Sequence, residues 1–215
     1  MTSWINKDTE IYCSFAKTAG NTGCQMMNTA FYYYGLNKIY KSFSVDSIED
    51  AVRSVKTLNI KGFAVTMPFK QDVLKYVDEI CDSAKIGAAN TVVNENNKLK
   101  AYNTDYLASL DYLRKFQHHD NFYIIGDGGY STAVKAAARK LNMDYDNITR
   151  SEWTKLHDIE NGLIYNCTPV EDLESILSDS NILIDCIVKT DTGKQLAKIQ
   201  ASYQFELYTG LKFPL

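Results

Sequence analysis

The sequence lacks several features that would place it in a functional class at once. None of its five cysteines forms a Cys-x-x-Cys pair, so neither a zinc site nor a disulfide framework is indicated, and reduced thiols are expected. It has no run of 18 apolar residues, and residues 1–8 hold no apolar core of signal-peptide length. A net charge of −3 disfavours a nucleic-acid partner bound by bulk electrostatics. We therefore expect a cytoplasmic protein with no membrane or nucleic-acid partner.

What the sequence does contain is an alternation of strand and helix signals. A length of 215 residues allows one large domain or two small ones. Alternating strands and helices predict an α/β fold with a mostly parallel sheet. Strands are expected over 10–14, 38–43, 62–66, 91–93, 99–102, 121–125, 143–148, 162–165 and 182–187, and helices over 24–34, 47–58, 71–77, 106–116, 131–141 and 193–208.

One strand stops abruptly before a lysine. The apolar run 62–65 reads as a buried strand that Pro68 cannot continue. Thr66 and Lys70 should lie at its end. A lysine there is either an ordinary solvated side chain or a partly buried group suited to acid–base chemistry.

The next polar cluster follows the same pattern. Small residues at 87–89 precede Asn90, and the hairpin return strand ends at Asn103, Thr104 and Asp105. Thr104 or Asp105 can be a helix cap, and this alternative stays open at the level of sequence.

A glycine-rich turn begins the second half. Residues 121–125 form a strand that runs into Gly126-Asp127-Gly128-Gly129-Tyr130-Ser131 and then into a helix. Strand, glycine turn and helix is the context in which backbone N–H groups bind a diphosphate. The alternative is a plain tight turn. Asp127 is awkward for a diphosphate unless its carboxylate points away.

The end of the following strand bears on the choice of cofactor. An acidic residue there favours NAD, whereas an arginine suits the 2′-phosphate of NADP. Asp146 falls inside the expected strand, but Thr149 and Arg150 fall at its end. NADP is therefore preferred, with NAD as the alternative.

Together these stretches resemble the shikimate dehydrogenase family, and more closely its shikimate-dehydrogenase-like branch. The matches occur in family order across nearly the whole chain. They are Val65-Thr66-Met67-Pro68-Phe69-Lys70, Gly87-Ala88-Ala89-Asn90-Thr91, Tyr102-Asn103-Thr104-Asp105, Gly126-Asp127-Gly128-Gly129, Asn166-Cys167-Thr168-Pro169, and the stretch from Gln200 through Gln204-Phe205-Glu206-Leu207-Tyr208-Thr209-Gly210.

The resemblance implies roles for these residues. Lys70 and Asp105 correspond to the catalytic pair of the family. The substrate contacts it implies are Asn21, Thr66, Asn90, Thr104 and Gln200. The cofactor contacts are Gly126, Gly128, Gly129, Tyr130, Ser131, Thr149, Arg150, Asn166 and Thr168. Two departures stand out: Asn21 and Gly23 occupy the usual Ser-x-Ser positions, and Val188 replaces a tyrosine.

The implied architecture is an α/β substrate domain (1–104 plus 192–215) and a reduced Rossmann-like NADP-binding domain (105–191), with the active site in a cleft between them. The implied function is NADP-dependent interconversion of 3-dehydroshikimate and shikimate, or of a related hydroxylated cyclic carboxylate, in the chorismate pathway of aromatic amino-acid biosynthesis. We expect a monomer or homodimer and no metal. The alternative is a degenerate member that binds a small molecule or nucleotide without catalysis, which the shortened second domain, Asp127 and the lost Ser-x-Ser pattern favour.

Overall fold

The structure is a computed structural model that describes residues 5–214. The expectation about the N-terminus rests on residues 1–8, of which 1–4 lie outside the described residues. The chain divides into two compact units. Unit 1 contains the residues up to Thr104 and those from Ala201 onward, and unit 2 contains Asp105–Gln200.

The predicted domain boundary at residue 192 therefore differs from the division between the units. Helix α5 (Asp191–Thr209) contributes to both of them. Leu196 packs in a core cluster of unit 2, whereas Ala201 and Phe205 pack in a core cluster of unit 1. Because the helix continues without interruption across this change of core, no local signal in the sequence marks it.

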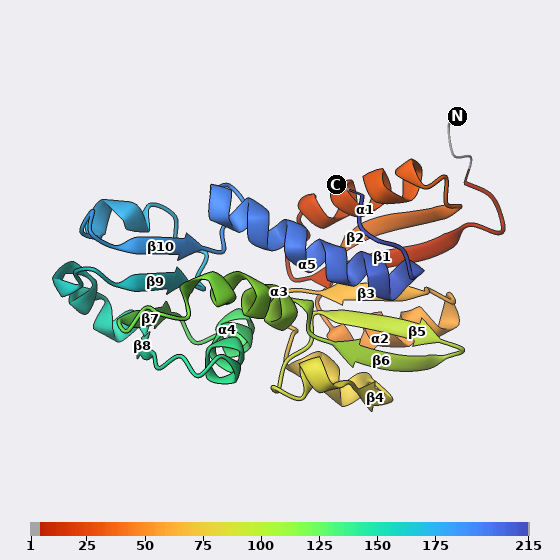
Figure 1. Ribbon diagram of the computed structural model, residues 1–215. Coiled ribbons are helices and arrows are strands. Elements are labelled where there is room, and N and C mark those ends of the chain that lie inside the picture. The colour runs from red at the N-terminus through yellow and green to blue at the C-terminus, as the bar shows by residue number, and fades with distance from the viewer. Residues whose placement is uncertain (1–4, 215) are drawn as a thin grey trace. The chain divides into compact units, whose positions relative to one another are not determined.

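Unit 1 is built on a six-stranded sheet with the order β2-β1-β3-β5-β6-β4 (Figure 1). β1 pairs in parallel with β2 and β3, and β4 with β6, while β5 is antiparallel to β3 and β6. The β5–β6 hairpin turns at Asn96 and Asn97, whose φ angles of 53° and 66° suit asparagine. The strands are β1 (Glu10–Ala16), β2 (Lys38–Ser44), β3 (Gly62–Val65), β4 (Glu79–Ile80), β5 (Thr91–Glu95) and β6 (Lys98–Tyr102).

Helices cover both faces of this sheet. Successive strand residues point to opposite faces, so Cys13 packs with α2 (Ile48–Thr57), whereas Tyr12 packs with α1 (Thr22–Tyr33) and the end of α5. The helix expected over 71–77 is only a 3₁₀ segment, η1 (Asp72–Tyr76), and a second one, η2 (Asp82–Ala84), follows it.

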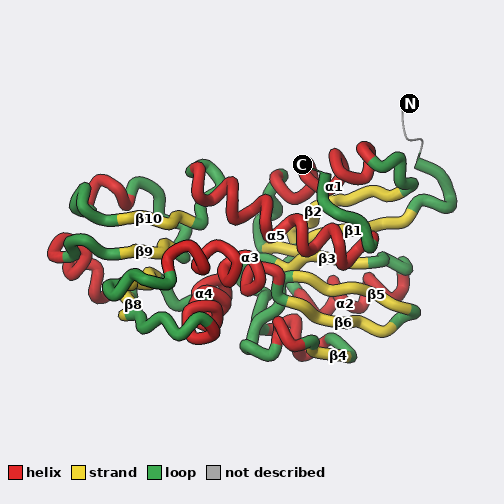
Figure 2. The backbone as a smooth tube through the Cα atoms, viewed as in Figure 1, coloured by secondary structure: helices red, strands yellow, loops and turns green. Residues whose placement is uncertain are grey.

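Unit 2 holds a four-stranded, fully parallel sheet with the order β10-β9-β7-β8 (Figure 1). Strands of this sheet, among them β9 and β10, are drawn in yellow in Figure 2. One face packs against α3, α4 and the start of α5, and the other against the 3₁₀ segments η4 and η5. The elements are α3 (Thr104–Leu113), η3 (Arg114–Phe116), β7 (Phe122–Ile125), α4 (Gly129–Lys140), β8 (Asp146–Ile148), η4 (Arg150–Asp158), β9 (Leu163–Asn166), η5 (Leu173–Ile176) and β10 (Ile182–Asp185).

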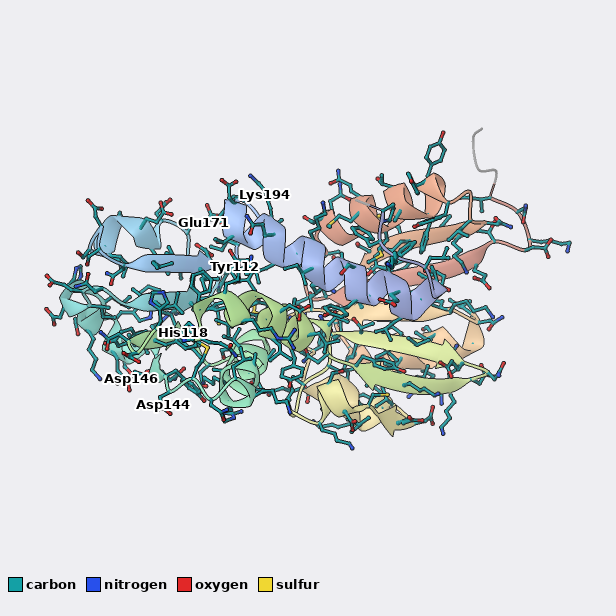
Figure 3. The ribbon with its side chains drawn as sticks, in the orientation of Figure 1. Tyr112, His118, Asp144, Asp146, Glu171 and Lys194 are labelled. Carbon is teal, nitrogen blue, oxygen red and sulfur yellow. The ribbon has the colours of Figure 1, made fainter. Side chains whose placement is uncertain are left out.

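The predicted α/β class with mostly parallel pairing is thus confirmed. His118 is an exposed loop residue after η3 (Figure 3). Within residues 5–214, none of the helices has both the length and the apolar character needed to cross a bilayer.

Candidate functional site

The predicted substrate-binding residues of unit 1 gather at one edge of its sheet. β1, β3 and β6 run in the same direction, so their carboxyl ends meet there. Backbone hydrogen bonds join the loops: Lys17 N donates to Met67 O (3.3 Å), Val65 N to Asn90 O (2.8 Å), and Asn90 N to Tyr102 O (3.1 Å). Segments far apart in the sequence therefore form a single rim.

Thr66 and Lys70 stand on this rim on a fixed backbone. Thr66 N donates to Phe15 O (3.0 Å), and Thr66 O accepts from Phe69 N (2.9 Å), while the Thr66 side chain is exposed. Lys70 O accepts from Ala89 N at 2.7 Å, which places the backbone of the half-buried Lys70 beside the residue that precedes Asn90. The strand end thus presents Thr66 and Lys70 in a defined frame.

Asn90 is the most constrained polar side chain of the rim. It is 5% exposed, and its Oδ1 accepts from Thr104 N (2.7 Å), Thr104 Oγ1 (3.1 Å) and Thr91 Oγ1 (3.2 Å). Among the described residues, the hydrogen bonds of this side chain all use Oδ1. Its Nδ2 therefore remains a pre-oriented donor for a ligand.

The start of α3 is anchored by the same network. Asn103 is fully buried and donates Nδ2 to Ala88 O at 2.8 Å. Thr104 begins α3, and its hydroxyl bond to Asn90 orients that asparagine. Asp105 follows in the first turn of α3 and is buried.

The other two predicted substrate contacts lie on helices. Asn21 is the exposed N-cap residue of α1, and its side chain makes no capping hydrogen bond, so its amide is available to a ligand. Gln200 is half-buried on α5 and belongs to unit 2, whereas the other four belong to unit 1.

The predicted cofactor-binding residues gather at the carboxyl edge of the unit 2 sheet. All four strands are parallel, and the residues that follow them are bonded to one another. Gly126 N donates to Ile148 O (3.0 Å), Cys167 N to Ile125 O (2.9 Å) and Cys186 N to Asn166 O (3.2 Å). In open parallel sheets, ligands bind outside this edge.

The glycine turn has a conformation that requires glycine. Gly126 has a φ of 109°, and a Cβ there would come within 2.9 Å of Thr168 Cγ2. Gly128 is the N-cap of α4, with no side-chain cap, and a Cβ there would have no heavy atom within 4 Å. Buried Ser131 donates its Oγ to Gly128 O at 2.8 Å. The turn thus places the N-terminus of α4, which has no side-chain cap, beside open space at Gly128.

Tyr130 belongs to the core of unit 2. Its hydroxyl is 3.1 Å from that of the fully buried Tyr165, whose hydroxyl is 3.5 Å from Ser109 Oγ. Burial raises the pKa of Tyr130 well above its ordinary value, and the charges of neighbouring groups, including Asp105, add to the effect. Tyr130 therefore remains a neutral hydroxyl.

The end of β8 carries an exposed arginine. Thr149 caps η4, and Glu152 closes the capping box by accepting from Thr149 N (3.2 Å) and Oγ1 (2.9 Å). Arg150 is exposed at this carboxyl end. Asp146 begins the strand at the opposite end and points outward (Figure 3). The strand thus carries the arginine, and not Asp146, at the edge where a ligand would bind.

Asn166 links the neighbouring strand ends instead of offering a free donor. It is fully buried; its Oδ1 accepts from Thr168 N (2.9 Å) and Oγ1 (2.7 Å), and its Nδ2 donates to Val170 O and Asp185 Oδ1 (3.2 Å each). In this arrangement Asn166 fixes the shape of the loop that carries Thr168. Burial raises the pKa of Asp185.

Three important polar residues were given no role from the sequence. Asn103 was recognised as part of a motif, but its bond to Ala88 O was not foreseen. Lys135 and Asp185 carry no local signal, because their roles depend on contacts with Asp127 and Asn166.

Known proteins resemble this chain in sequence and in fold. The model for the shikimate dehydrogenase substrate binding domain matches residues 22–92. A shikimate dehydrogenase-like protein of Haemophilus influenzae is 31% identical, over 95% of this chain and 92% of its own length. The chain therefore belongs to the shikimate dehydrogenase family.

Two further family members support the assignment. The shikimate dehydrogenase (NADP(+)) of Caldanaerobacter subterraneus is 31% identical over 85% of both chains. The solved structure of a shikimate 5-dehydrogenase-like protein superposes with a TM-score of 0.82 and 29% identity, covering 97% of this chain and 94% of the other. The family likeness therefore extends over both units.

Proposed function

We propose that this chain is an NADP-dependent oxidoreductase that interconverts 3-dehydroshikimate and shikimate, or a related hydroxylated cyclic carboxylate. The observation that carries the proposal is the rim of unit 1, where the backbone of Lys70 is bonded next to Asn90, an oriented amide donor. Relatives over most of the chain are named shikimate dehydrogenases.

The rim residues suit the chemistry of a ring ketone. Bound NADP would supply or accept the hydride. The Lys70 ammonium stabilises the developing alkoxide and exchanges the proton with it. Asp105, the residue after Thr104, is the carboxylate that we assign to orient Lys70. Hydroxyl and amide groups suit a substrate rich in hydroxyls, because buried polar groups must be paired; we assign this role to Asn21, Thr66, Asn90 and Gln200.

The residues of unit 2 fit a dinucleotide. The turn at Gly126–Gly128 exposes uncapped N–H groups at the start of α4, where a diphosphate is favoured. Arg150 stands exposed at the end of β8, where a 2′-phosphate would be bound in such a fold. Thr149 and Thr168 border the same edge.

An absorbance assay tests the proposal directly. Purified protein with NADP⁺ and shikimate should develop the absorbance of reduced nicotinamide, and quinate in place of shikimate tests the related-acid alternative. No change with either acid at any pH from 6 to 10 would overturn the proposal.

A second candidate is a family member that binds ligand without catalysis. It is favoured by the short passage from the end of β10 at Asp185 to the start of α5 at Asp191, which carries an exposed Val188. Calorimetry with shikimate and with NADPH separates the two candidates: binding of shikimate without binding of NADPH favours this one.

A further inference from the structure

The glycine turn of unit 2 contains an aspartate beside a helix N-terminus. Asp127 directly precedes Gly128, the N-cap of α4. A carboxylate in such a place ordinarily accepts from the first N–H groups and is stabilised by the helix dipole. These are the same donors that bind a phosphate group. An aspartate used in this way would compete with a diphosphate for its site.

Asp127 does not act as a cap in this structure. Its Oδ1 lies 2.7 Å from Lys135 Nζ, and the start of α4 has no side-chain capping bond. Lys135 lies further along α4, and helical side chains lean toward the helix N-terminus, so its stem reaches back to the turn. The lysine side chain is only 16% exposed, whereas that of Asp127 is 73% exposed. The buried partner therefore sets the direction of the exposed one.

We propose that Lys135 is a positioning residue that holds the carboxylate of Asp127 against the flank of α4, away from its first N–H groups. The pair also has no net charge, so an incoming diphosphate meets no uncompensated anion at the start of α4. This inference rests on the proposed function, because it assumes that a dinucleotide binds at this turn.

Binding of NADPH to four proteins, measured by calorimetry, tests this inference. Lys135→Met keeps the apolar stem but removes the ammonium, which frees Asp127 to cap the helix and repel the diphosphate. We expect affinity for NADPH to fall about tenfold. Adding Asp127→Asn should return the affinity to within about threefold of the wild type. The matched control is Lys140→Met, which removes a lysine from the exposed far end of the same helix and should change nothing.

The double variant separates this role from others. If Lys135 were merely structural, or bound the cofactor itself, removal of the Asp127 charge would not restore binding, and that result would overturn the inference. Unchanged affinity in Lys135→Met would overturn it too, and leave the proposed function intact. If the wild-type protein bound no NADPH, that result would contradict the proposed function itself, and with it this inference. Melting temperatures of all four proteins verify folding, and Lys135→Gln replaces the methionine variant if that variant unfolds.

Discussion

The two units present their candidate residues in different ways. In unit 1 the rim is locked by buried side chains that bond to one another, with Asn90 and Asn103 at its centre. In unit 2 the edge is shaped by backbone conformation at Gly126 and carries exposed charges, Asp127 and Arg150. The first arrangement fixes polar donors in space before a ligand arrives, whereas the second leaves open backbone groups for a phosphate.

The helical segments that pack on the two sheets differ as well. Helices cover both faces of the unit 1 sheet, but one face of the unit 2 sheet rests on the 3₁₀ segments η4 and η5. The hydrogen bonds of 3₁₀-helices have poorer geometry than those of α-helices. The comparison therefore predicts that substitutions in unit 1 act on chemistry, and that those in unit 2 act on cofactor affinity and local stability.

Loss of the Lys70 ammonium should have the largest effect. Lys70→Met should lower kcat by about 10³-fold, because a general acid contributes about 10²–10⁴-fold, while NADPH affinity measured by calorimetry stays unchanged. Lys75→Met removes an exposed lysine of the neighbouring η1 and is the matched control. Retained activity in Lys70→Met would contradict the assigned role.

Arg150→Ala should come next and act on cofactor choice. Loss of a charged contact to the 2′-phosphate should weaken NADPH binding by about 10–100-fold, in line with about 1.5–3 kcal/mol for such bonds. Binding of NADH, which lacks that phosphate, should not change. Arg139→Ala, on the last turn of α4, is the control. Equal losses for both cofactors would argue against specific recognition of the 2′-phosphate.

Two glycines, one in each unit, provide a test of close packing. A Cβ at Gly193 would lie 1.9 Å from Ile187 O, a backbone atom, and one at Gly62 would lie 2.5 Å from the buried ring of Tyr208. Overpacking of this kind should lower the free energy of unfolding by about 3 kcal/mol in Gly193→Ala and by about 2 kcal/mol in Gly62→Ala.

Urea unfolding midpoints and slopes measure both costs. The control is Gly23→Ala. Gly23 lies in α1, and a Cβ there would have no heavy atom within 4 Å. The free energy of unfolding of this variant should therefore rise by up to about 1 kcal/mol. If Gly193→Ala were no less stable than Gly23→Ala, this result would contradict the close packing of Gly193 against Ile187.

The smallest effect should be a pH dependence at Glu152. Hydrogen bonding from Lys155 and Thr149 lowers the pKa of Glu152 from 4.5 to about 2. A depressed folded-state pKa gives stability that is fully present above the unfolded value and is lost as the pH falls toward about 2. The melting temperature of wild type should exceed that of Glu152→Gln by a small, constant amount from pH 7 to 5.

That difference should shrink as the pH is lowered from 4.5 toward 2. Because both proteins carry all the other titrating groups, their contributions cancel in the comparison. A difference independent of pH across this range would show that Glu152 does not stabilise η4 through its charge.

Local signals predicted much of the fold. The strands expected over 91–93 and 99–102 form the β5–β6 hairpin, and Pro68 marked the end of β3. The segments η4 and η5 escaped prediction, because 3₁₀ turns lack the periodicity that reveals α-helices. Motif order brought Lys70 and Asn90 into the candidate site, but it did not reveal that the side chain of Asn166 is bonded to Thr168, Val170 and Asp185.

By itself the sequence determined where β3 stops, because proline acts on the backbone of its own neighbourhood. It also determined the family, through motifs in a fixed order. Only the tertiary structure decided that Asn90 is oriented by Thr104, that α5 serves two cores, and that Asp127 pairs with Lys135 instead of capping its helix. Each of these depends on which side chains meet once strands and helices have packed, a property that neighbouring residues in the chain do not encode.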